Sequence, residues 1–283
     1  MTADEIYGMA QELSAQGAAF AIATVIETQG SGSAKPGAKV LIDADGQIVM
    51  GWIGGGCVES TVRQEAKESI QDGKTRVIEL DLTDEVFGVG MPCGGSMKVY
   101  IEPVLPRPEL VIAGHGRIAE TLARFAHILG FSITVADPAA TTEGFPDTDH
   151  LYTTGLASPE VLIKPNAFVV VATHHKGDHL SIKKALDSNA GYIALVASRT
   201  RSEIIFQYLE AAGVPKEKIA NGRLRTPAGL DIRAQTPEEI ALSIIAEVVA
   251  HYRGGSGRPL VETNQIVMGH ASRPQPVSSC CAG

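Results

Sequence analysis

The chain has 283 residues, of which 44% are hydrophobic and 20% are charged, a composition that excludes a wholly disordered protein. Its 24 basic and 32 acidic residues give a formal net charge of −8, which excludes the overall basic field of a nucleic-acid-binding domain. At about 150 residues per domain, this length predicts roughly two domains.

The lack of a recognisable targeting signal, together with the small number of cysteines, predicts a cytoplasmic protein without a membrane partner. The N-terminus lacks the basic and apolar regions of a signal peptide, and no apolar run reaches the roughly 18 residues that cross a bilayer. Four cysteines in a chain of this length do not make a disulfide scaffold. We therefore expect Cys57 and Cys93 to be free thiols in a reducing compartment.

The first 105 residues predict a small α+β domain. Apolar residues three or four positions apart indicate a helix over 4–16 and a second helix over 58–70. Asp45-Gly46 is typical of a β-hairpin turn, and a proline-rich linker follows at 105–108. Between these signals, β-rich runs predict strands over 19–28, 39–43, 47–53, 75–82 and 96–104.

Residues 106–252 predict a Rossmann-like domain with a doubly wound parallel sheet, which makes the whole chain α/β. Short apolar runs alternate with helical patterns, as in parallel sheets. Residues 253–283 are rich in Gly, Pro and Ser and indicate a C-terminal tail, in which the vicinal Cys280-Cys281 are interpreted as part of a flexible end. The predicted strands are 109–113, 131–136, 167–172 and 192–197, and the last helix is 237–252.

A glycine-rich turn is the first chemical signal. Gly114-His115-Gly116-Arg117-Ile118-Ala119 follows a strand, opens a helix and matches the G-x-G-x-x-A dinucleotide fingerprint. Asp137 follows about twenty residues later, where a carboxylate holds a ribose hydroxyl. The same turn also allows close helix–strand packing in a domain that binds something else, so both interpretations stay open.

Two cysteines lie in glycine-rich loops. Cys57 follows Gly54-Gly55-Gly56 and starts a helix, where free N–H groups and the helix dipole lower the pKa of a thiol. Cys93 precedes Gly94-Gly95, which lets a bulky ligand approach the backbone. The alternative is that each cysteine is a small buried residue. Neither belongs to a C-x-x-C pair, so a structural zinc site is not expected.

Several motifs, in order along the chain, resemble the XdhC/CoxI family of maturation factors for xanthine dehydrogenase and related molybdenum hydroxylases. The resemblance covers nearly all of residues 1–252 but not the tail. Its N-terminal motifs are Gly-Ser-Gly-Ser at 30–33, Pro-Gly-Ala-Lys at 36–39, Gly-Gly-Gly-Cys-Val-Glu at 54–59 and Pro-Cys-Gly-Gly at 92–95, followed by 99–103. Its Rossmann motifs are Thr-His-His at 173–175 with Asp178, Ala-Ser-Arg at 197–199, Pro-Ala-Gly-Leu-Asp-Ile at 227–232 and Thr-Pro-Glu-Glu-Ile-Ala at 236–241.

The resemblance implies a chaperone rather than a metabolic enzyme. Such a protein binds the molybdenum cofactor, a pterin dithiolene with a phosphate, while a cysteine desulfurase installs its sulfido ligand. It then delivers the cofactor to a hydroxylase client of the xanthine dehydrogenase or carbon monoxide dehydrogenase type. The family also implies a homodimer. The chain departs from many relatives at 32–35, where it has Gly-Ser-Ala-Lys in place of a segment with Ala-Pro-Arg, and at His175.

A phosphate-bearing, sulfur-containing ligand needs N–H donors, cations and thiolates. We expect Cys57 and Cys93 to approach one another across a cleft and to ligate the metal. A second cluster consists of His174, His175, Asp178 and His179. It is interpreted either as a metal or proton-transfer site or as a solvated loop in which Asp178 caps a helix. No catalytic residue is assigned. The predicted cofactor-binding residues are Lys35, Lys39, Gly54, Gly55, Gly56, Cys57, Cys93, Gly94, Gly95, Gly114, Gly116, Arg117, Asp137, His174, Asp178, Ser198 and Arg199.

Two other functions compete with the chaperone. The first is an NAD(P)-dependent oxidoreductase, which would bind its nucleotide at the turn that begins with Gly114 and use His174 as acid or base. The second is a thiol enzyme with Cys57 as nucleophile, for which no histidine lies close in sequence. The expected cofactors are therefore the molybdenum cofactor and, as a further candidate, a nucleotide such as NAD(P).

Overall fold

The computed structural model describes residues 2–30, 34–81, 95–173 and 177–263. The chain forms two compact units, Met1–Arg107 and Pro108–Gly283, which we call the N-terminal and C-terminal units. The first has an antiparallel sheet and the second a parallel one, so the predicted α/β fold class is confirmed. Within the described part of the chain, no helix is long and apolar enough to span a bilayer.

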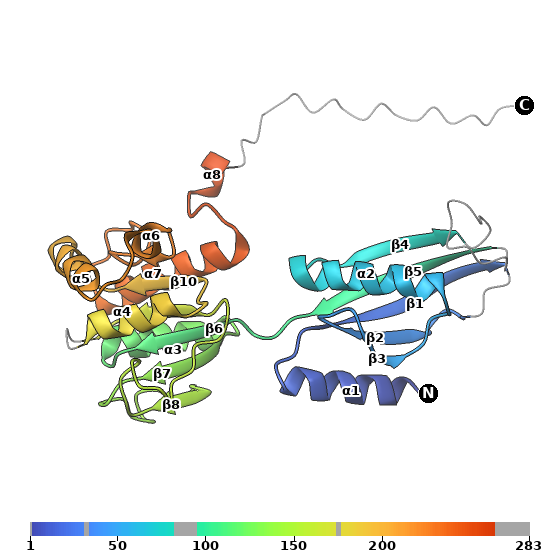
Figure 1. Ribbon diagram of the computed structural model, residues 1–283, viewed down its shortest axis with the longest axis horizontal. Coiled ribbons are helices and arrows are strands. Elements are labelled where there is room, and N and C mark those ends of the chain that lie inside the picture. Colours follow the sequence, from blue (N-terminus) through green and yellow to red (C-terminus); the bar gives the residue numbers. More distant parts are fainter. Residues whose placement is uncertain (1, 31–33, 82–94, 174–176, 264–283) are drawn as a thin grey trace, which may run out of the picture. The chain divides into compact units, whose positions relative to one another are not determined.

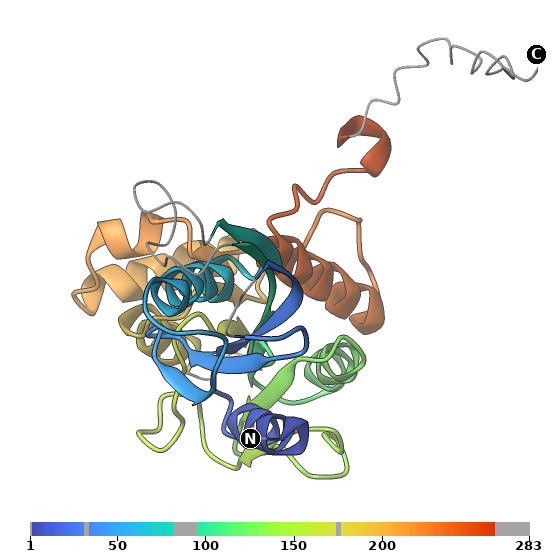
Figure 2. The ribbon, with the colours of Figure 1, turned by 90° about the vertical axis from the view of Figure 1, so that its right-hand side faces the viewer.

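The N-terminal unit is a five-stranded antiparallel sheet with one helix on each face. Helix α1 (Ala3–Ala15) and helix α2 (Cys57–Asp72) lie on opposite sides of this sheet (Figures 1 and 2). The sheet order is β3 (Ile48–Gly51), β2 (Lys39–Asp43), β1 (Phe20–Gly30), β5 (Gly95–Val104) and β4 (Arg76–Asp81).

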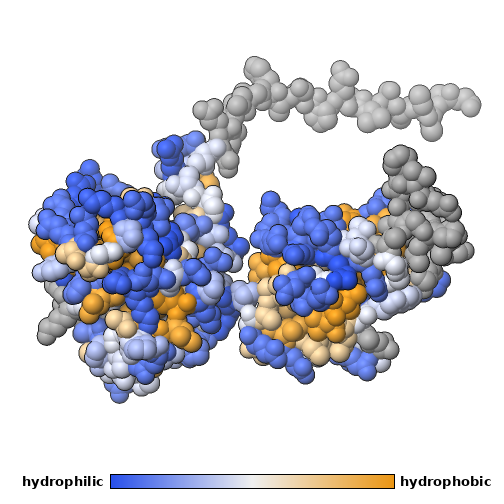
Figure 3. Space-filling view, in the orientation of Figure 1, coloured by the Kyte–Doolittle hydropathy of each residue, from blue (hydrophilic) through white to orange (hydrophobic). Residues whose placement is uncertain are grey.

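The two faces of this sheet are covered unequally. The α2 face carries a large buried cluster that includes Ala23, Val62 and Val99, whereas the buried cluster on the α1 face consists of Ile6, Phe20 and Leu41. A groove of about 520 Å³ therefore runs beside α1. Apolar surface is visible on this unit between the two helices (Figure 3).

Local sequence signals account for the start of α1 and for the β2–β3 hairpin. Thr2 and Glu5 form a reciprocal capping box at the start of α1. Between β2 and β3, the Asp43 carboxylate accepts hydrogen bonds from the backbone N–H groups of Asp45 and Gln47 at 3.0 and 2.7 Å. Gly46 has a φ of +79°, which a hairpin turn of this kind requires.

The C-terminal unit is a six-stranded parallel sheet with the strand order of a Rossmann fold. The order is β11 (Leu224–Arg225), β10 (Tyr192–Leu195), β9 (Phe168–Val171), β6 (Glu109–Ala113), β7 (Ser132–Ala136) and β8 (His150–Tyr152). The chain builds outward from β6 in one direction and from β9 in the other. The gap between β6 and β9 is therefore the topological switch point, where such sheets bind ligands.

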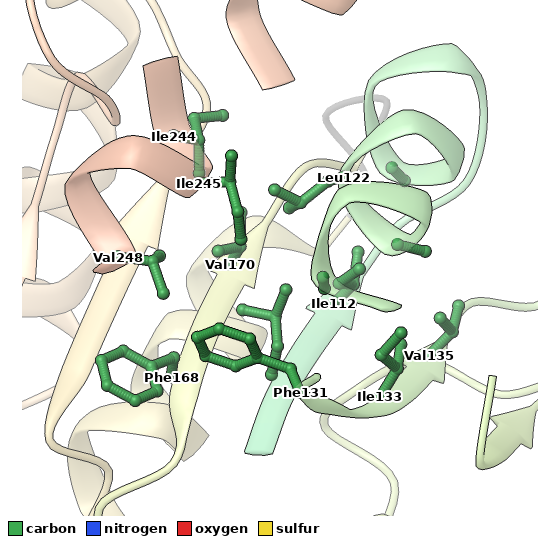
Figure 4. Packing of buried hydrophobic residues seen from close by; sticks show 14 of the residues in the cluster. Ile112, Leu122, Phe131, Ile133, Val135, Phe168, Val170, Ile244, Ile245 and Val248 are labelled. Atoms are coloured by element: carbon green, nitrogen blue, oxygen red, sulfur yellow. The ribbon is translucent and has the colours of Figure 1, made fainter. Parts of the chain in front are cut away.

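Helices cover both faces of the parallel sheet, so its central strands are apolar on both sides. Helices α3 (Arg117–Ile128) and α7 (Pro237–Arg253) enclose one core, in which Leu122, Ile245 and Val248 pack over Phe168 and Val170 (Figure 4). The other face has a second core beneath α4 (Asp178–Asp187) and α5 (Arg199–Ala211). The short helices α6 (Lys216–Ala220) and α8 (Leu260–Thr263) complete the described elements.

The sequence did not predict the edge strands β8 and β11. They contain only three and two residues, which is too short for an apolar period to be recognised. The last helix, predicted over 237–252, is observed as α7 over Pro237–Arg253, with a capping box between Thr236 and Glu239.

Candidate functional site

One end of the N-terminal sheet gathers two of the glycine-rich segments. The last residue of β1, Gly30, pairs with Gly95, the first residue of β5, and Asp81 at the end of β4 pairs with Ser96. Gly95 has a φ of +136°, and a Cβ added to it would lie 1.9 Å from the carbonyl oxygen of Gln29. The close approach of the two strands at this end therefore requires glycine at position 95.

Helix α2 begins at the same end of this sheet. Its C-terminal cap, Gly73, lies at the opposite end, because a Cβ added there would contact Leu105, just beyond the end of β5, at 3.3 Å. The first residue of α2, Cys57, therefore lies at the end that holds Gly30 and Gly95, as Figure 1 shows.

The start of α2 is suited to an anion. Its N-cap is Gly56, with a φ of 63°, and no side chain caps the first N–H groups. Gly54 also has a positive φ, of 122°. A Cβ added to Gly55 or Gly56 would meet nothing within 4 Å, so a ligand can approach this turn closely. Backbone N–H groups and the helix dipole together favour a phosphate there.

The two predicted lysines of this unit lie in different surroundings. Lys35 is exposed and follows Ala34, which is buried in the α2-face cluster together with Ile53 and Val58 at the start of α2. The Lys39 ammonium instead donates to Thr24 Oγ1 at 2.9 Å and lies 6.0 Å from the centre of the Tyr7 ring, on the α1 face. The residue before Lys35 thus packs on the α2 face of the sheet, whereas the Lys39 side chain lies on the α1 face.

Lys39 supports the glycine turn through its backbone. Its carbonyl oxygen accepts a hydrogen bond from Trp52 N–H at 3.0 Å, and a Cβ added to Gly51 would lie 2.3 Å from the same oxygen. The chain that leads into Gly54 is therefore packed directly on β2.

Three of the predicted residues, Cys93, Gly94 and His174, lie outside the described residues, as does His175. The predicted approach of Cys57 to Cys93 and their ligation of a metal therefore stay predictions. Among the described residues, no three His, Cys, Asp or Glu side chains are grouped so that they could hold a metal ion.

In the C-terminal unit, the G-x-G turn lies at the topological switch point. Gly114 has a φ of +138°, and an added Cβ would lie 2.3 Å from the carbonyl oxygen of Ala172, which follows β9. Gly116 is the N-cap of α3, with a φ of 86° and without a side-chain cap. Arg117 is exposed, and its guanidinium lies 2.5 Å from the Glu238 carboxylate in the first turn of α7.

Asp137 follows β7, as expected, but its carboxylate is already engaged by the protein. The residue is only 7% exposed. Its Oδ1 accepts hydrogen bonds from the backbone N–H of Ala139 at 2.8 Å and from His115 Nδ1 at 2.7 Å. His115 was not among the predicted site residues, although its place between the two glycines of the turn was visible in the sequence.

Asp178 belongs to a buried polar cluster at the same edge of the sheet. The residue is 2% exposed, and its carboxylate accepts hydrogen bonds from Arg201 Nε at 3.1 Å, from Arg201 Nη2 at 2.8 Å and from the Thr173 hydroxyl. The expectation that Asp178 caps α4 is wrong: the N-cap is Gly177, and no side chain bonds to the helix start. Arg201 was also missed, because its partner is 23 residues away in the sequence.

Ser198 and Arg199, which follow β10, are both exposed. Ser198 is the N-cap of α5, and its side-chain oxygen accepts a hydrogen bond from Arg201 N–H at 3.3 Å. The C-terminal unit therefore presents Arg117, Ser198 and Arg199 on its surface and keeps Asp137 and Asp178 buried in internal contacts.

Two family models match the chain. The model described as the XdhC and CoxI family matches residues 13–81, and the model described as the XdhC Rossmann domain matches residues 110–248. These ranges fall in the N-terminal and C-terminal units respectively.

Three curated relatives are similar over much of the chain. The uncharacterized protein YqeB of Escherichia coli K12 is 36% identical over 251 residues, which are 86% of this chain and 46% of YqeB. A protein of Bacillus subtilis 168 described as a probable xanthine dehydrogenase component is 33% identical over 163 residues, 54% of this chain and 46% of that protein. The chain thus spans less than half the length of these two relatives. The molybdenum cofactor insertion chaperone PaoD of Escherichia coli K12 is 23% identical over 281 residues, 87% of each chain.

A solved structure, described as a xanthine dehydrogenase from Bacillus halodurans, is 24% identical with a TM-score of 0.47, over 90% of this chain and 96% of that one. The two family models account for most of both units, and they confirm the resemblance seen in the sequence motifs. The chain belongs to the XdhC/CoxI family.

Proposed function

We propose that this protein is a maturation factor that binds the molybdenum cofactor and delivers it to a molybdenum hydroxylase. One observation carries the proposal. Helix α2 starts at Gly56 and Cys57 without a side-chain cap, and this start lies at the end of the sheet where Gly30 pairs with Gly95. Membership of the XdhC/CoxI family and the similarity to PaoD, whose name describes insertion of this cofactor, support it.

The residues at this end suit the chemistry of the cofactor. Its phosphate would lie against the N–H groups of the Gly54–Cys57 turn, where an added Cβ at Gly55 or Gly56 finds open space. The exposed Lys35 would add a cation. Its ammonium group would form a charge-assisted hydrogen bond to the phosphate, and such bonds are stronger than those between neutral groups. When bound, the cofactor supplies a molybdenum centre for which a cysteine thiolate is a suitable soft ligand.

We assign the two cysteines the role of metal ligands in this proposal. Cys57 is the first residue of α2, and Cys93 stands two positions before Gly95 in the chain. Gly94 and Gly95 would keep side chains away from the bound pterin. Lys39 contributes through its backbone contact with Gly51 and Trp52 rather than through its ammonium group.

The C-terminal unit has a separate part in the proposal. Gly114, Gly116 and Arg117 would contact a phosphate group, and the exposed Ser198 and Arg199, with His174, would face the same edge. Asp137 and Asp178 are buried and bonded to His115 and Arg201, so we assign them the role of positioning those side chains.

Further steps follow from the family resemblance and belong to the proposal. We propose that a cysteine desulfurase adds the terminal sulfido ligand while the cofactor is held here. The client would be of the xanthine dehydrogenase or carbon monoxide dehydrogenase type. We further propose that the protein acts as a cytoplasmic homodimer.

The test is retention of the cofactor during anaerobic purification. The protein is purified from cells that make the cofactor, oxidised to release the fluorescent pterin, and analysed for pterin and molybdenum per chain. We expect Cys57→Ser to lower both by at least about tenfold, which corresponds to 1.4 kcal/mol of binding free energy. The control Cys280→Ser removes a thiol outside the matched family regions and should leave both unchanged. Equal retention in the two variants contradicts the proposal.

The alternative of an NAD(P)-dependent oxidoreductase predicts a different outcome from the same preparation. It requires NAD(P)-specific thermal stabilisation and no pterin. Its ribose contact would have to be Asp137, whose Oδ1 already accepts two hydrogen bonds from the protein. This contact is the reason why the geometry favours the maturation factor over the oxidoreductase.

A further inference from the structure

The C-terminal unit has the backbone of a dinucleotide-binding turn but occupies one of its hydrogen-bonding positions with its own side chain. The strand order reverses between β6 and β9, and Gly114 and Gly116 shape the turn beside this switch point. In dinucleotide-binding domains of this fold, an acidic residue at the end of the second strand accepts a hydrogen bond from the adenine ribose. Asp137 is that residue here, since β7 ends at Ala136.

One of the two carboxylate oxygens of Asp137, Oδ1, is committed within the protein. The residue is only 7% exposed, and its Oδ1 takes its hydrogen bonds from protein donors. Ala139 N–H donates to Oδ1 at 2.8 Å, and His115 Nδ1 lies 2.7 Å from the same oxygen. The imidazole therefore bridges the glycine turn and the end of β7, which is the path that the adenine ribose of a dinucleotide takes in this fold.

From this contact we infer that His115 is a specificity-determining residue that excludes adenine dinucleotides from the C-terminal unit. A ribose hydroxyl that approaches from the glycine turn can reach Oδ1 of Asp137 only by displacing the imidazole. One hydrogen bond to the carboxylate is then exchanged for another, so the exchange yields no net gain in binding, and the displaced imidazole must find new partners. The phosphate-facing part of the turn, at Gly116 and Arg117, is not affected by this contact.

The experiment is calorimetric titration of the full chain with NAD⁺ and, separately, with NADP⁺. The wild-type protein should bind NAD⁺ with a dissociation constant of about 1 mM or weaker, which is the range of non-specific contacts. His115→Ala should bind NAD⁺ at least tenfold more tightly than wild type, because the imidazole no longer lies between the glycine turn and Oδ1 of Asp137. It should show less gain for NADP⁺, whose 2′-phosphate the carboxylate repels.

Two further variants make the result specific. The double variant His115→Ala/Asp137→Ala should lose the gain, and His127→Ala, which removes an exposed histidine from the last turn of α3, should behave as wild type. If His115→Ala does not fold, as judged by circular dichroism, His115→Ser takes its place. Micromolar binding of NAD⁺ by the wild-type protein, no gain on removing the imidazole, or a gain that persists without Asp137 would each overturn the inference.

Discussion

The Asp178 carboxylate at the start of α4 lies 2.8 Å from Nη2 of Arg201 in the first turn of α5. Asp178 is almost fully buried and the Arg201 side chain is 27% exposed, so the pair is shielded from water mainly on the carboxylate side. The Thr173 hydroxyl donates to the same carboxylate from the segment that follows β9. The pair therefore joins two consecutive β–α connections at the edge where this fold places its ligands.

We expect Asp178→Asn to destabilise the C-terminal unit by about 2 kcal/mol, because it removes the buried negative charge that faces the Arg201 guanidinium. The control is Asp187→Asn, which removes a partly exposed partner of Lys183 and Lys218 and should cost less than about 1 kcal/mol. Urea unfolding followed by circular dichroism measures both variants. The fluorescence of Trp52, the single tryptophan, reports the N-terminal unit and should be unaffected. Equal losses in the two variants would contradict a special role for the buried pair.

A methyl group at Gly114 should disrupt the switch point. The added Cβ would lie 2.3 Å from the Ala172 carbonyl oxygen, and the φ of +138° is strained for any L side chain. We expect Gly114→Ala to cost more than about 2 kcal/mol of unfolding free energy. Gly155→Ala is the matched control, because nothing lies within 4 Å of its added Cβ, and it should change stability by less than about 0.5 kcal/mol. A tolerated Gly114→Ala would show that the two strands can separate at this edge.

Helix α1 contains a glycine that its surroundings do not require. Gly8 lies in the interior of the helix, and an added Cβ would meet nothing within 4 Å. Because glycine loses more backbone entropy than alanine on entering a helix, Gly8→Ala should stabilise the N-terminal unit by about 0.5–1 kcal/mol. Thermal unfolding followed by Trp52 fluorescence measures the gain. A loss of stability instead would mean that something packs against this position in solution.

The buried hydroxyl of Tyr192 should make stability depend on alkaline pH. It donates to Glu247 Oε2 at 2.7 Å, and burial, followed by the Glu247 charge, raises the pKa of this phenol. The unfolded chain releases the phenolic proton above pH about 10, while the folded chain retains it. The contribution of the Tyr192 phenol to folding stability is therefore fully present below pH about 10 and is lost as the pH rises above that value.

Tyr192→Phe removes this dependence together with the hydrogen bond. At pH 8 the variant should be less stable than wild type by about 1 kcal/mol. The difference should shrink between pH 10 and pH 11.5, as wild type loses the contribution that the variant lacks. The control is Tyr208→Phe, which removes an exposed hydroxyl and should change stability at pH 8 by less than about 0.5 kcal/mol. Melting temperatures across this range measure both; a constant difference for Tyr192→Phe would contradict the raised pKa.

The sequence predicted the parallel sheet and the glycine turn because both depend on local patterns. The sequence alone shows the apolar run at 109–113 and the turn Gly114-His115-Gly116, without knowledge of the rest of the fold. The sheet face on which the Lys39 side chain lies could not be predicted from the sequence, because Val40, Leu41 and Ile42 are all buried. With helices on both faces of the sheet, the alternation of polar and apolar residues that would orient this strand is absent.

The side-chain pairs at the C-terminal sheet edge could not be predicted for a different reason. His115 meets Asp137, and Asp178 meets Arg201, across 22 and 23 residues respectively. Each contact forms only because consecutive parallel strands end side by side, which is a property of the assembled sheet. Candidate residues at strand ends were therefore predictable, whereas their bonding partners required the three-dimensional arrangement.

Each of the four apolar clusters among the described residues draws its members from one unit alone, two on either side of the boundary between Arg107 and Pro108. The hydrophobic driving force for folding each unit thus comes from the hydrophobic core of that unit. A gene cut between codons 107 and 108 should consequently yield two separately expressible fragments, and metallopterin and nucleotide assays could then be assigned to one fragment at a time.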